Sequence, residues 1–341
     1  MPRFLVICTY IGQLPSFFRL FSHSCRYVPE LDFLILTDSE EPHFPLPPNV
    51  RVEKLTIADF QKRTRRALGI SGPIHSGYKL NDYKPMYGDI FSDLLEGYDY
   101  WGSGDIDLIF SPRLADFITE GVAEDADIMN TSTLWLHGPL TLYKNTESMV
   151  KLYRKSKDWR LVVERPEHFA FDECGLKYKQ ICRRLGVPSG YYPGHQSYLD
   201  LEPDSYRAMQ NFQCMTAVVS REHQAGNCRV FQGFVLRGHI EPGEHLEVRN
   251  GYIVDGHGVS WCAYHWVTEK ARRKFGYPRW ESTPVEFFIS QYGFFEAGKP
   301  WFNRWLVTVR FAQAVLLLLH DRLIFHIGHL GIGPRPSEQF K

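Results

Sequence analysis

Residues 98–110 constrain the fold of this chain more than any other stretch of its sequence. An apolar, aromatic run enters a turn of glycine and serine, two aspartates one residue apart follow, and a second apolar run begins directly after them. A solvated acidic turn rarely has such apolar flanks, which are typical of buried strands. Because side chains at positions i and i+2 of extended backbone point to the same side, Asp105 and Asp107 are expected to face one point at the end of a buried strand.

Two carboxylates held close together repel each other unless a cation lies between them. Mg²⁺ and Mn²⁺ suit such an oxygen-rich site, and a substrate phosphate usually completes their coordination. Asp105 and Asp107 therefore predict a divalent cation site that serves a nucleoside diphosphate. An Asp-x-Asp triplet alone is a weak signal, because it also occurs by chance on solvated turns. The interpretation depends on the rest of the chain.

The N-terminal region has the spacing of β-α-β units. Residues 4–10 form a continuous apolar run of strand length, a helix is expected over 15–25, and further strands are expected over 32–36 and around 50–55. This order favours a parallel sheet with right-handed crossovers, in which ligands bind outside the carboxyl ends of the strands. Residues at these ends are predicted nucleotide contacts, with an ordinary turn role as the alternative for each: Thr9, Tyr10, Gly12 and Asp38.

Two helical segments come before the aspartates. Residues 57–68 predict a helix whose run of lysines and arginines we interpret as a solvated face. A second helix is predicted to begin near Asp82, with Pro85 in its first turn and apolar residues at helical spacing over 86–95. Because phosphate binds readily at a helix N-terminus, Lys79, Asp82 and Lys84 are predicted nucleotide contacts. The alternative for Asp82 is a helix cap and nothing more.

The bulk composition excludes some classes of partner. Lysine plus arginine equals aspartate plus glutamate at 39 each, so no overall charge favours nucleic acid, and we expect none as a partner. The seven cysteines form no C-x-x-C pair, which argues against a zinc ribbon and for free thiols in a reducing cytoplasm. The apolar start is interrupted too early for a signal peptide and is interpreted as a first strand.

The C-terminal region contains a strongly apolar segment of helical length, residues 305–319. Its uncharged core, 311–319, is too short to span a bilayer, which needs about 20 residues. A helix docked on the protein is the first interpretation. The alternative is a helix that lies in the membrane surface, which would give the protein peripheral contact with the inner face of the cell membrane.

Several motifs, taken in chain order, resemble those of the GT-A glycosyltransferases, particularly the bacterial families that build surface polysaccharides such as capsule and lipopolysaccharide. The motifs are residues 79–85, 98–110, 138–145, 171–173 and 264–266. The resemblance implies an α/β fold with a Rossmann-like, mostly parallel sheet flanked by helices. It implies a transferase domain over 1–275, with a nucleotide-binding half over 1–130 and an acceptor half over 131–275, followed by a C-terminal helical extension over 276–341.

The resemblance also implies a function: metal-dependent transfer of a sugar from a nucleoside-diphosphate donor to a polysaccharide or lipid-linked glycan acceptor. Asp105 would then lie near the ribose and the cation, Asp107 would bind Mn²⁺ or Mg²⁺ directly, and His265 would be a late metal ligand. Without the resemblance, a lone histidine on an aromatic strand is better interpreted as a packed core residue.

An inverting transferase needs a carboxylate base within hydrogen-bond reach of the acceptor hydroxyl. Asp172 and Glu173 are the candidates, with Asp172 slightly ahead, and a helix N-cap is the alternative for both. If the enzyme retains configuration, neither has to act as a base. The sequence leaves the stereochemistry open.

Two other functions compete with this one. A sugar-nucleotide nucleotidyltransferase normally has a glycine-rich, basic loop after its first strand, whereas residues 9–13 contain one glycine and no basic residue. A non-catalytic carbohydrate-binding or assembly protein on a transferase scaffold would explain the 15% aromatic content. Such a protein has no need to bind nucleotide and Mn²⁺ cooperatively, so that measurement separates it from the enzyme.

Overall fold

The computed structural model describes residues 2–174, 198–200, 213–241, 243–266, 275–278 and 280–298, together with 308, 309, 312 and 316. The chain divides into two units, of which the first contains Met1–Arg237 and Ser260–His265. The second contains Gly238–Val259 and Trp266–Lys341. Strand pairing of residues 263–265 with β5 Leu108–Phe110 ties this late segment to the first unit, although residues 238–259 before it belong to the second.

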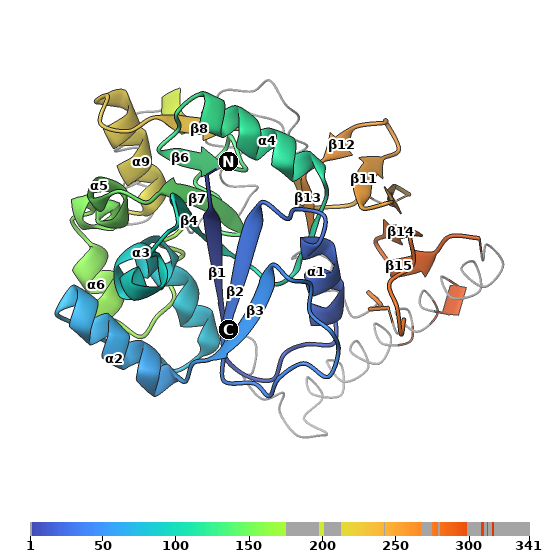
Figure 1. The fold of residues 1–341 in the computed structure, drawn as a ribbon, viewed down its shortest axis with the longest axis horizontal. Helices are drawn as coiled ribbons and strands as arrows, with labels where there is room; N and C mark the ends of the chain where they lie inside the picture. The colour runs from blue at the N-terminus through green and yellow to red at the C-terminus, as the bar shows by residue number, and fades with distance from the viewer. Residues whose placement is uncertain are drawn as a thin grey trace, which may run out of the picture. The chain divides into compact units, whose positions relative to one another are not determined.

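The first unit is built around a mixed, mostly parallel sheet with the strand order β3-β2-β1-β4-β7-β6-β8 (Figure 1). β1 is parallel to both β2 and β4, and β2 is parallel to β3, whereas β7 is antiparallel to both β4 and β6. The α/β class and the mostly parallel sheet predicted from the sequence are therefore confirmed. The strands are β1 Phe4–Tyr10, β2 Leu31–Thr37, β3 Val50–Lys54, β4 Tyr100–Gly104, β6 Ile128–Asn130, β7 Leu140–Lys144 and β8 Val230–Gln232.

Helices cover both faces of this sheet, because alternate residues of β1 enter two different cores. Leu5 and Ile7 face a core shared with α2, α3, α5, α6 and α9, whereas Val6 and its neighbours face a core shared with α1 and α4 (Figure 1). The helices are α1 Phe18–Cys25, α2 Ile57–Leu68, α3 Tyr87–Ile90, α4 Arg113–Ala123, α5 Glu147–Val150, α6 Trp159–Glu164 and α9 Met215–Gln224.

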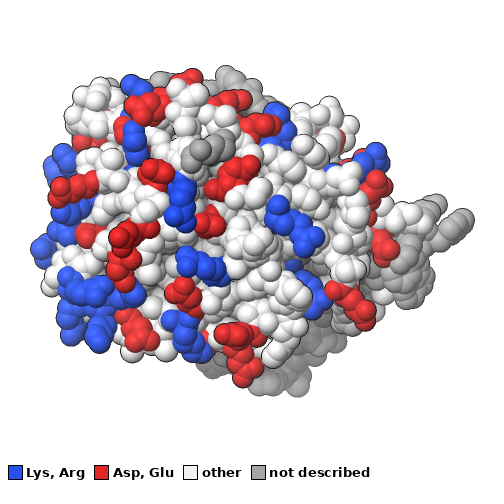
Figure 2. All heavy atoms as spheres, in the orientation of Figure 1, with Lys and Arg blue, Asp and Glu red and all other residues white. Residues whose placement is uncertain are grey.

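The basic residues of α2 lie on its outer side, as predicted for a solvated face. Figure 2 shows the lysine and arginine side chains gathered at the lower left, where Figure 1 places α2. Lys62, Arg65 and Arg66 are exposed, and Arg63 forms an ion pair with Asp93 at 2.7 Å.

The long helix predicted over residues 82–95 is divided into three short pieces. They are η1 Gly77–Met86, α3 Tyr87–Ile90 and η2 Ser92–Leu94. Asp82 does not cap a helix, because its carboxylate turns inward and accepts bonds from the backbone N–H groups of Phe169 and Phe171. The helical residues after β7 are likewise in two short pieces, α5 and η3 Leu152–Lys155. A further short helix is η4 Tyr198–Asp200.

A small three-stranded sheet brings a distant segment beside the two aspartates. Its order is β5-β13-β9, with β5 Leu108–Phe110, β13 Ala263–His265 and β9 Leu236–Arg237. β13 is antiparallel to β5, and His265 lies opposite Leu108 in the register. The strand that carries the late histidine therefore ends where the aspartate turn enters β5. A further strand, β12 Ser260–Trp261, comes directly before β13.

The second unit contains antiparallel strands in the order β11-β10-β14-β15. They are β10 His245–Arg249, β11 Tyr252–Asp255, β14 Glu286–Ser290 and β15 Gly293–Glu296. Asn250 and Gly251 have φ angles of 49° and 83°, as a type I′ turn requires.

The predicted helical extension over 276–341 is wrong for residues 286–290 and 293–296, which form the strands β14 and β15. In β14, Phe287 and Ile289 alternate with more exposed residues, as in a strand with one buried face. Most of residues 305–319, where membrane contact is predicted, lie outside the described residues. Within the described residues, no helix has the length and apolar character needed to cross a membrane.

Candidate active site

Asp105, Asp107 and His265 form one group at the carboxyl end of β4. Asp105 follows β4, Asp107 precedes β5, and His265 is the last residue of β13. One ligand atom from each side chain lies within 4.8 Å of the other two. His265 Nε2 is 3.3 Å from Asp107 Oδ1 and 4.0 Å from Asp105 Oδ2. The structure thus brings together the three residues that the sequence analysis predicted as metal ligands.

The chemistry of this group fits a divalent cation. It offers two carboxylates and one imidazole, and this mixture of oxygen and nitrogen donors suits Mn²⁺, with Mg²⁺ as the harder alternative. Asp107 and His265 are only 5% and 7% exposed, and such burial favours a neutralising cation because two carboxylates share the site. Asp105 remains partly exposed, which leaves one side of the group open to a ligand.

A second group, made of Asp82, His168 and Asp172, has similar spacing. The Asp82 carboxylate in this group, however, already accepts hydrogen bonds from the N–H groups of Phe169 and Phe171 and from the Lys79 ammonium. Within the described residues, the group around Asp107 is therefore the better candidate for a metal site.

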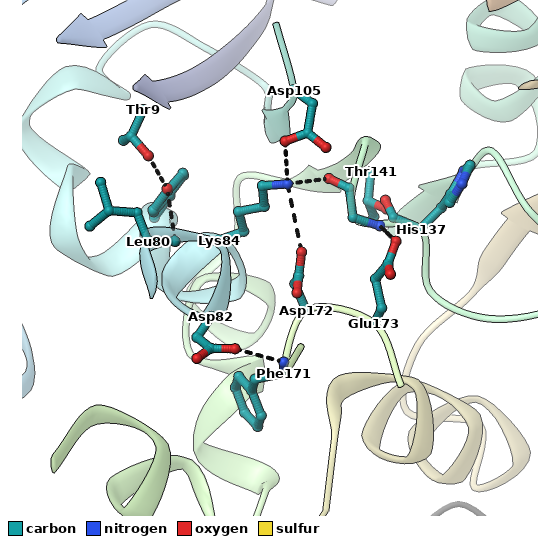
Figure 3. Close-up of polar contacts among 12 residues, drawn as sticks. Thr9, Leu80, Asp82, Lys84, Asp105, His137, Thr141, Phe171, Asp172 and Glu173 are labelled. Atoms are coloured by element: carbon teal, nitrogen blue, oxygen red, sulfur yellow. Dashed lines mark hydrogen bonds and ion pairs between the residues drawn. The ribbon is translucent and has the colours of Figure 1, made fainter. Parts of the chain in front are cut away.

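Lys84 connects the two acidic parts of the site. Its ammonium lies 2.7 Å from Asp105 Oδ1, 2.9 Å from the Gly138 carbonyl oxygen and 3.6 Å from Asp172 Oδ2 (Figure 3). Burial lowers the pKa of Lys84, but the carboxylates of Asp105 and Asp172 raise it more, so the pKa stays above its usual range and the side chain is charged. Three acceptors surround its three N–H groups, so this geometry supports a positioning role rather than the predicted direct contact with phosphate.

Lys79 has a similar arrangement one turn earlier. The buried ammonium donates to Asp82 at 2.9 Å and to the carbonyl oxygens of Val162 and Glu167 at 2.7 Å each. Asp82 is itself fully buried, and its bond to the Phe171 N–H is visible in Figure 3. The structure therefore gives Lys79 and Asp82 a structural role in place of the predicted contact with nucleotide. Together they hold the segment that carries Asp172.

Asp172 and Glu173 lie on the other side of Lys84 from Asp105 (Figure 3). Asp172 is buried, and Glu173 accepts a bond of 3.0 Å from the Gly138 N–H. Burial raises the pKa of both carboxyl groups, well above the usual range for Asp172, and the neighbouring Glu173 charge adds to that rise. The pair therefore keeps a proton at higher pH than ordinary carboxyl groups. The helix that they were alternatively expected to cap would follow residue 174, outside the described residues.

Gly138 is a site residue that the sequence analysis missed. Its N–H donates to Glu173, its carbonyl oxygen accepts from Lys84, and a Cβ at this position would lie 2.4 Å from Asp172 Oδ2. Such a distance is far inside van der Waals contact, so a larger residue at position 138 would force Asp172 to move. The Gly-Pro pair at 138–139 indicated a turn, but nothing in the sequence linked that turn to Asp172.

Two histidines beside the site were also missed. Burial lowers the pKa of His137 to about 3, so its ring is neutral. Thr131 donates to the Leu140 carbonyl oxygen and lies 2.8 Å from His137 Nδ1, so Nδ1 carries the ring hydrogen and donates to the threonine oxygen. Burial also lowers the pKa of His168, which lies beside Asp82.

The predicted nucleotide contacts on the first two strands lie at adjacent carboxyl ends, because β1 and β2 are parallel. The Gly12 N–H donates to Asp38 at 2.6 Å, and its φ of 107° suits glycine. The Thr9 hydroxyl is 2.6 Å from the hydroxyl of Tyr87, the first residue of α3 (Figure 3). The Tyr87 hydroxyl in turn donates to the Leu80 carbonyl oxygen, so Tyr87 connects Thr9 of β1 to η1. Tyr10, the last residue of β1, is half-buried.

The site lies mostly within a recognised family segment. A family model, described as a family of unknown function (DUF6625), matches residues 6–245. The matched segment includes Lys84, the aspartate pair and Asp172, whereas His265 follows it. No curated protein matches the chain.

Proposed function

We propose that the chain, which belongs to the DUF6625 family, is a metal-dependent glycosyltransferase that moves a sugar from a nucleoside-diphosphate donor to a hydroxyl group of a glycan acceptor. The observation that carries this proposal is the convergence of Asp105, Asp107 and His265 within 4.8 Å. They converge at the carboxyl edge of a mostly parallel sheet, where ligands of such folds bind. The resemblance of the motifs to GT-A glycosyltransferases supports the same function.

Asp105, Asp107 and His265 would hold Mn²⁺ or Mg²⁺. When bound there, the cation would offset the negative charge that develops on the leaving diphosphate. The turn at Gly12 and Asp38 lies at the neighbouring strand ends and is the proposed place of the nucleoside. Lys84 holds Asp105 in position and keeps a positive charge beside the reacting groups.

Asp172 and Glu173 are the proposed bases of an inverting transfer. The anomeric C–O bond to the diphosphate breaks, and its electron pair leaves with the diphosphate. A new bond forms between the anomeric carbon and the acceptor oxygen, and the carboxylate takes the hydroxyl proton. Burial raises the pKa of both groups, and a raised pKa makes a carboxylate a better base near neutral pH. In a retaining transfer neither group would be needed as a base.

The proposed acceptor is a polysaccharide or a lipid-linked glycan. This part of the proposal rests on the resemblance to bacterial transferases of surface polysaccharides. It implies work in the cytoplasm or at the inner face of the cell membrane, where nucleotide sugars are available.

A thermal-shift panel of UDP, GDP, CDP and TDP, each with and without Mn²⁺, tests the proposal. A ligand at about 100 times its dissociation constant stabilises the folded state by about 2.7 kcal/mol. For a chain of this size, that corresponds to a shift of roughly 5 °C. We expect such a shift for one base, only when Mn²⁺ is present. A folded protein that no nucleotide stabilises would contradict the proposal and favour a non-catalytic carbohydrate-binding scaffold.

A further inference from the structure

Tyr78 is an exposed aromatic side chain on an otherwise fixed segment. Its side chain is 65% exposed, and among the exposed large hydrophobic residues of the described chain the other aromatic one is Tyr252, at 46%. The backbone on both sides is held: a Cβ on Gly77 would lie 3.3 Å from Ile11 atoms, and the Lys79 ammonium makes three buried bonds. An exposed ring on a fixed backbone is pre-organised for contact with a ligand.

The Tyr78 ring is connected to the candidate base through His168. The centroids of the two rings are 4.5 Å apart, with an angle of 58° between their planes. A His168 ring nitrogen lies within 4.8 Å of carboxylate oxygens of both Asp82 and Asp172. His168 is thus a neighbour of both the exposed ring and Asp172, and it connects Tyr78 in two contacts to the group proposed to take the acceptor proton.

We propose that Tyr78, supported by His168, is the stacking platform for a pyranose ring of the acceptor. This inference rests on the proposed function, because it names the binding place of the sugar that receives the transfer. A pyranose presents a face of C–H groups to an aromatic ring and hydroxyl groups at its edge. Tyr78 offers the ring, and the carboxyl groups of Asp172 and Glu173 would be the partners of the hydroxyl groups.

The charges around Tyr78 favour a neutral sugar over an anionic group. The carboxylates of Asp82 and Asp172 lie beside His168, and burial lowers the pKa of His168, so the imidazole carries little positive charge at neutral pH. Both lysines nearby already face carboxylates. A phosphate group would therefore compete with carboxylates for both ammonium groups, whereas a hydroxylated ring would meet acceptors.

Saturation-transfer NMR with the full chain tests this inference. The probes are the methyl α- and β-pyranosides of glucose, galactose, mannose and N-acetylglucosamine, each measured with and without Mn²⁺ and nucleoside diphosphates. We expect saturation of the sugar ring protons in the wild type, in Tyr78→Phe, which keeps the ring, and in the control Tyr252→Ala. In Tyr78→Ala the affinity should fall by about 2- to 10-fold, the range expected for one aromatic contact.

Three results would overturn the inference: no saturation with any pyranoside, equal affinity in Tyr78→Ala and the wild type, or a loss in Tyr78→Ala confined to nucleotide binding. The last result would assign the ring to the nucleobase. A thermal shift of the same variants with Mn²⁺ and nucleotide separates this inference from the proposed function. If Mn²⁺ and nucleotide stabilise the wild type and Tyr78→Ala equally while sugar binding is unchanged, the inference fails and the proposed function stands. If they stabilise neither protein, the proposed function itself fails.

Discussion

The Lys84 ammonium nitrogen lies 2.7 Å from an oxygen of Asp105, although the two residues belong to different elements of the fold. The same nitrogen is 3.6 Å from Asp172, so one cation joins a predicted metal ligand to a predicted base. The geometry of the two acidic groups therefore depends on a single buried charge. Replacement of Lys84 should therefore lower both the stability and the activity of the protein.

Lys84→Met removes that charge and leaves Asp105 and Asp172 close together without their shared cation. Loss of one partner from a buried ion pair costs about 3–5 kcal/mol, and we expect a loss of free energy of unfolding in this range. Urea unfolding followed by circular dichroism measures it. The control is Lys62→Met on the exposed face of α2, which should change stability by less than about 0.5 kcal/mol. Equal stability of the two variants would contradict the role given to Lys84.

Gly138→Ala places a methyl group 2.4 Å from the present position of Asp172 Oδ2. Asp172 must move, and we expect a loss of about 1–3 kcal/mol in unfolding free energy, as for other overpacked sites. Urea unfolding measures this loss. Gly256→Ala is the matched control, since its added Cβ would meet no atom within 4 Å. A Gly138→Ala protein as stable as the control would show that Asp172 does not lie against this backbone.

Asp172→Asn should change the pH dependence of stability. Burial raises the folded-state pKa of Asp172 well above its ordinary value of 3.8. A raised pKa means that the folded state holds this proton more tightly. The contribution of Asp172 to stability is therefore fully present below pH 3.8 and is lost as pH rises through the folded-state pKa. Asparagine cannot ionise, so the variant should gain stability relative to the wild type as pH rises from about 4 towards neutral.

Urea unfolding of the wild type and Asp172→Asn at a series of pH values measures this difference. Asp116→Asn, on the exposed side of α4, is the control and should show no comparable gain. If the unfolding free energy of the variant relative to the wild type stays constant or falls as pH rises, the site does not destabilise the charged form of Asp172. Activity of the same variant bears on stereochemistry, because only an inverting transfer needs the base.

Local patterns were enough to predict much of the fold. The run at 4–10 is β1 and the amphipathic segment at 57–68 is α2, because each depends on residues close in sequence. The division of the predicted helix at 82–95 could not be read in this way. It depends on Asp82, whose partners lie 87 and 89 residues further along the chain.

The same difference between local patterns and contacts over long sequence distances applies to the site. The positions of Asp105 and Asp107 were predicted from strand geometry, whereas the convergence of His265 required the register of β13 against β5, and only the resemblance suggested it. The roles of Lys79 and Gly138 could not be predicted, because a lysine near a helix start and a Gly-Pro turn are common features. Their roles arise from contacts with segments far along the chain.

Turnover of a nucleotide sugar would show whether this protein is a metal-dependent glycosyltransferase. The full chain is incubated with Mn²⁺ and nucleoside-diphosphate hexoses of each base, and release of the free nucleoside diphosphate is followed. We predict release from one donor, its loss when the metal is chelated, and a fall of at least about 100-fold in Asp107→Asn that remains folded. An Asp107→Asn protein with full, metal-dependent activity, or a folded wild type that releases nothing from any donor, would contradict the account.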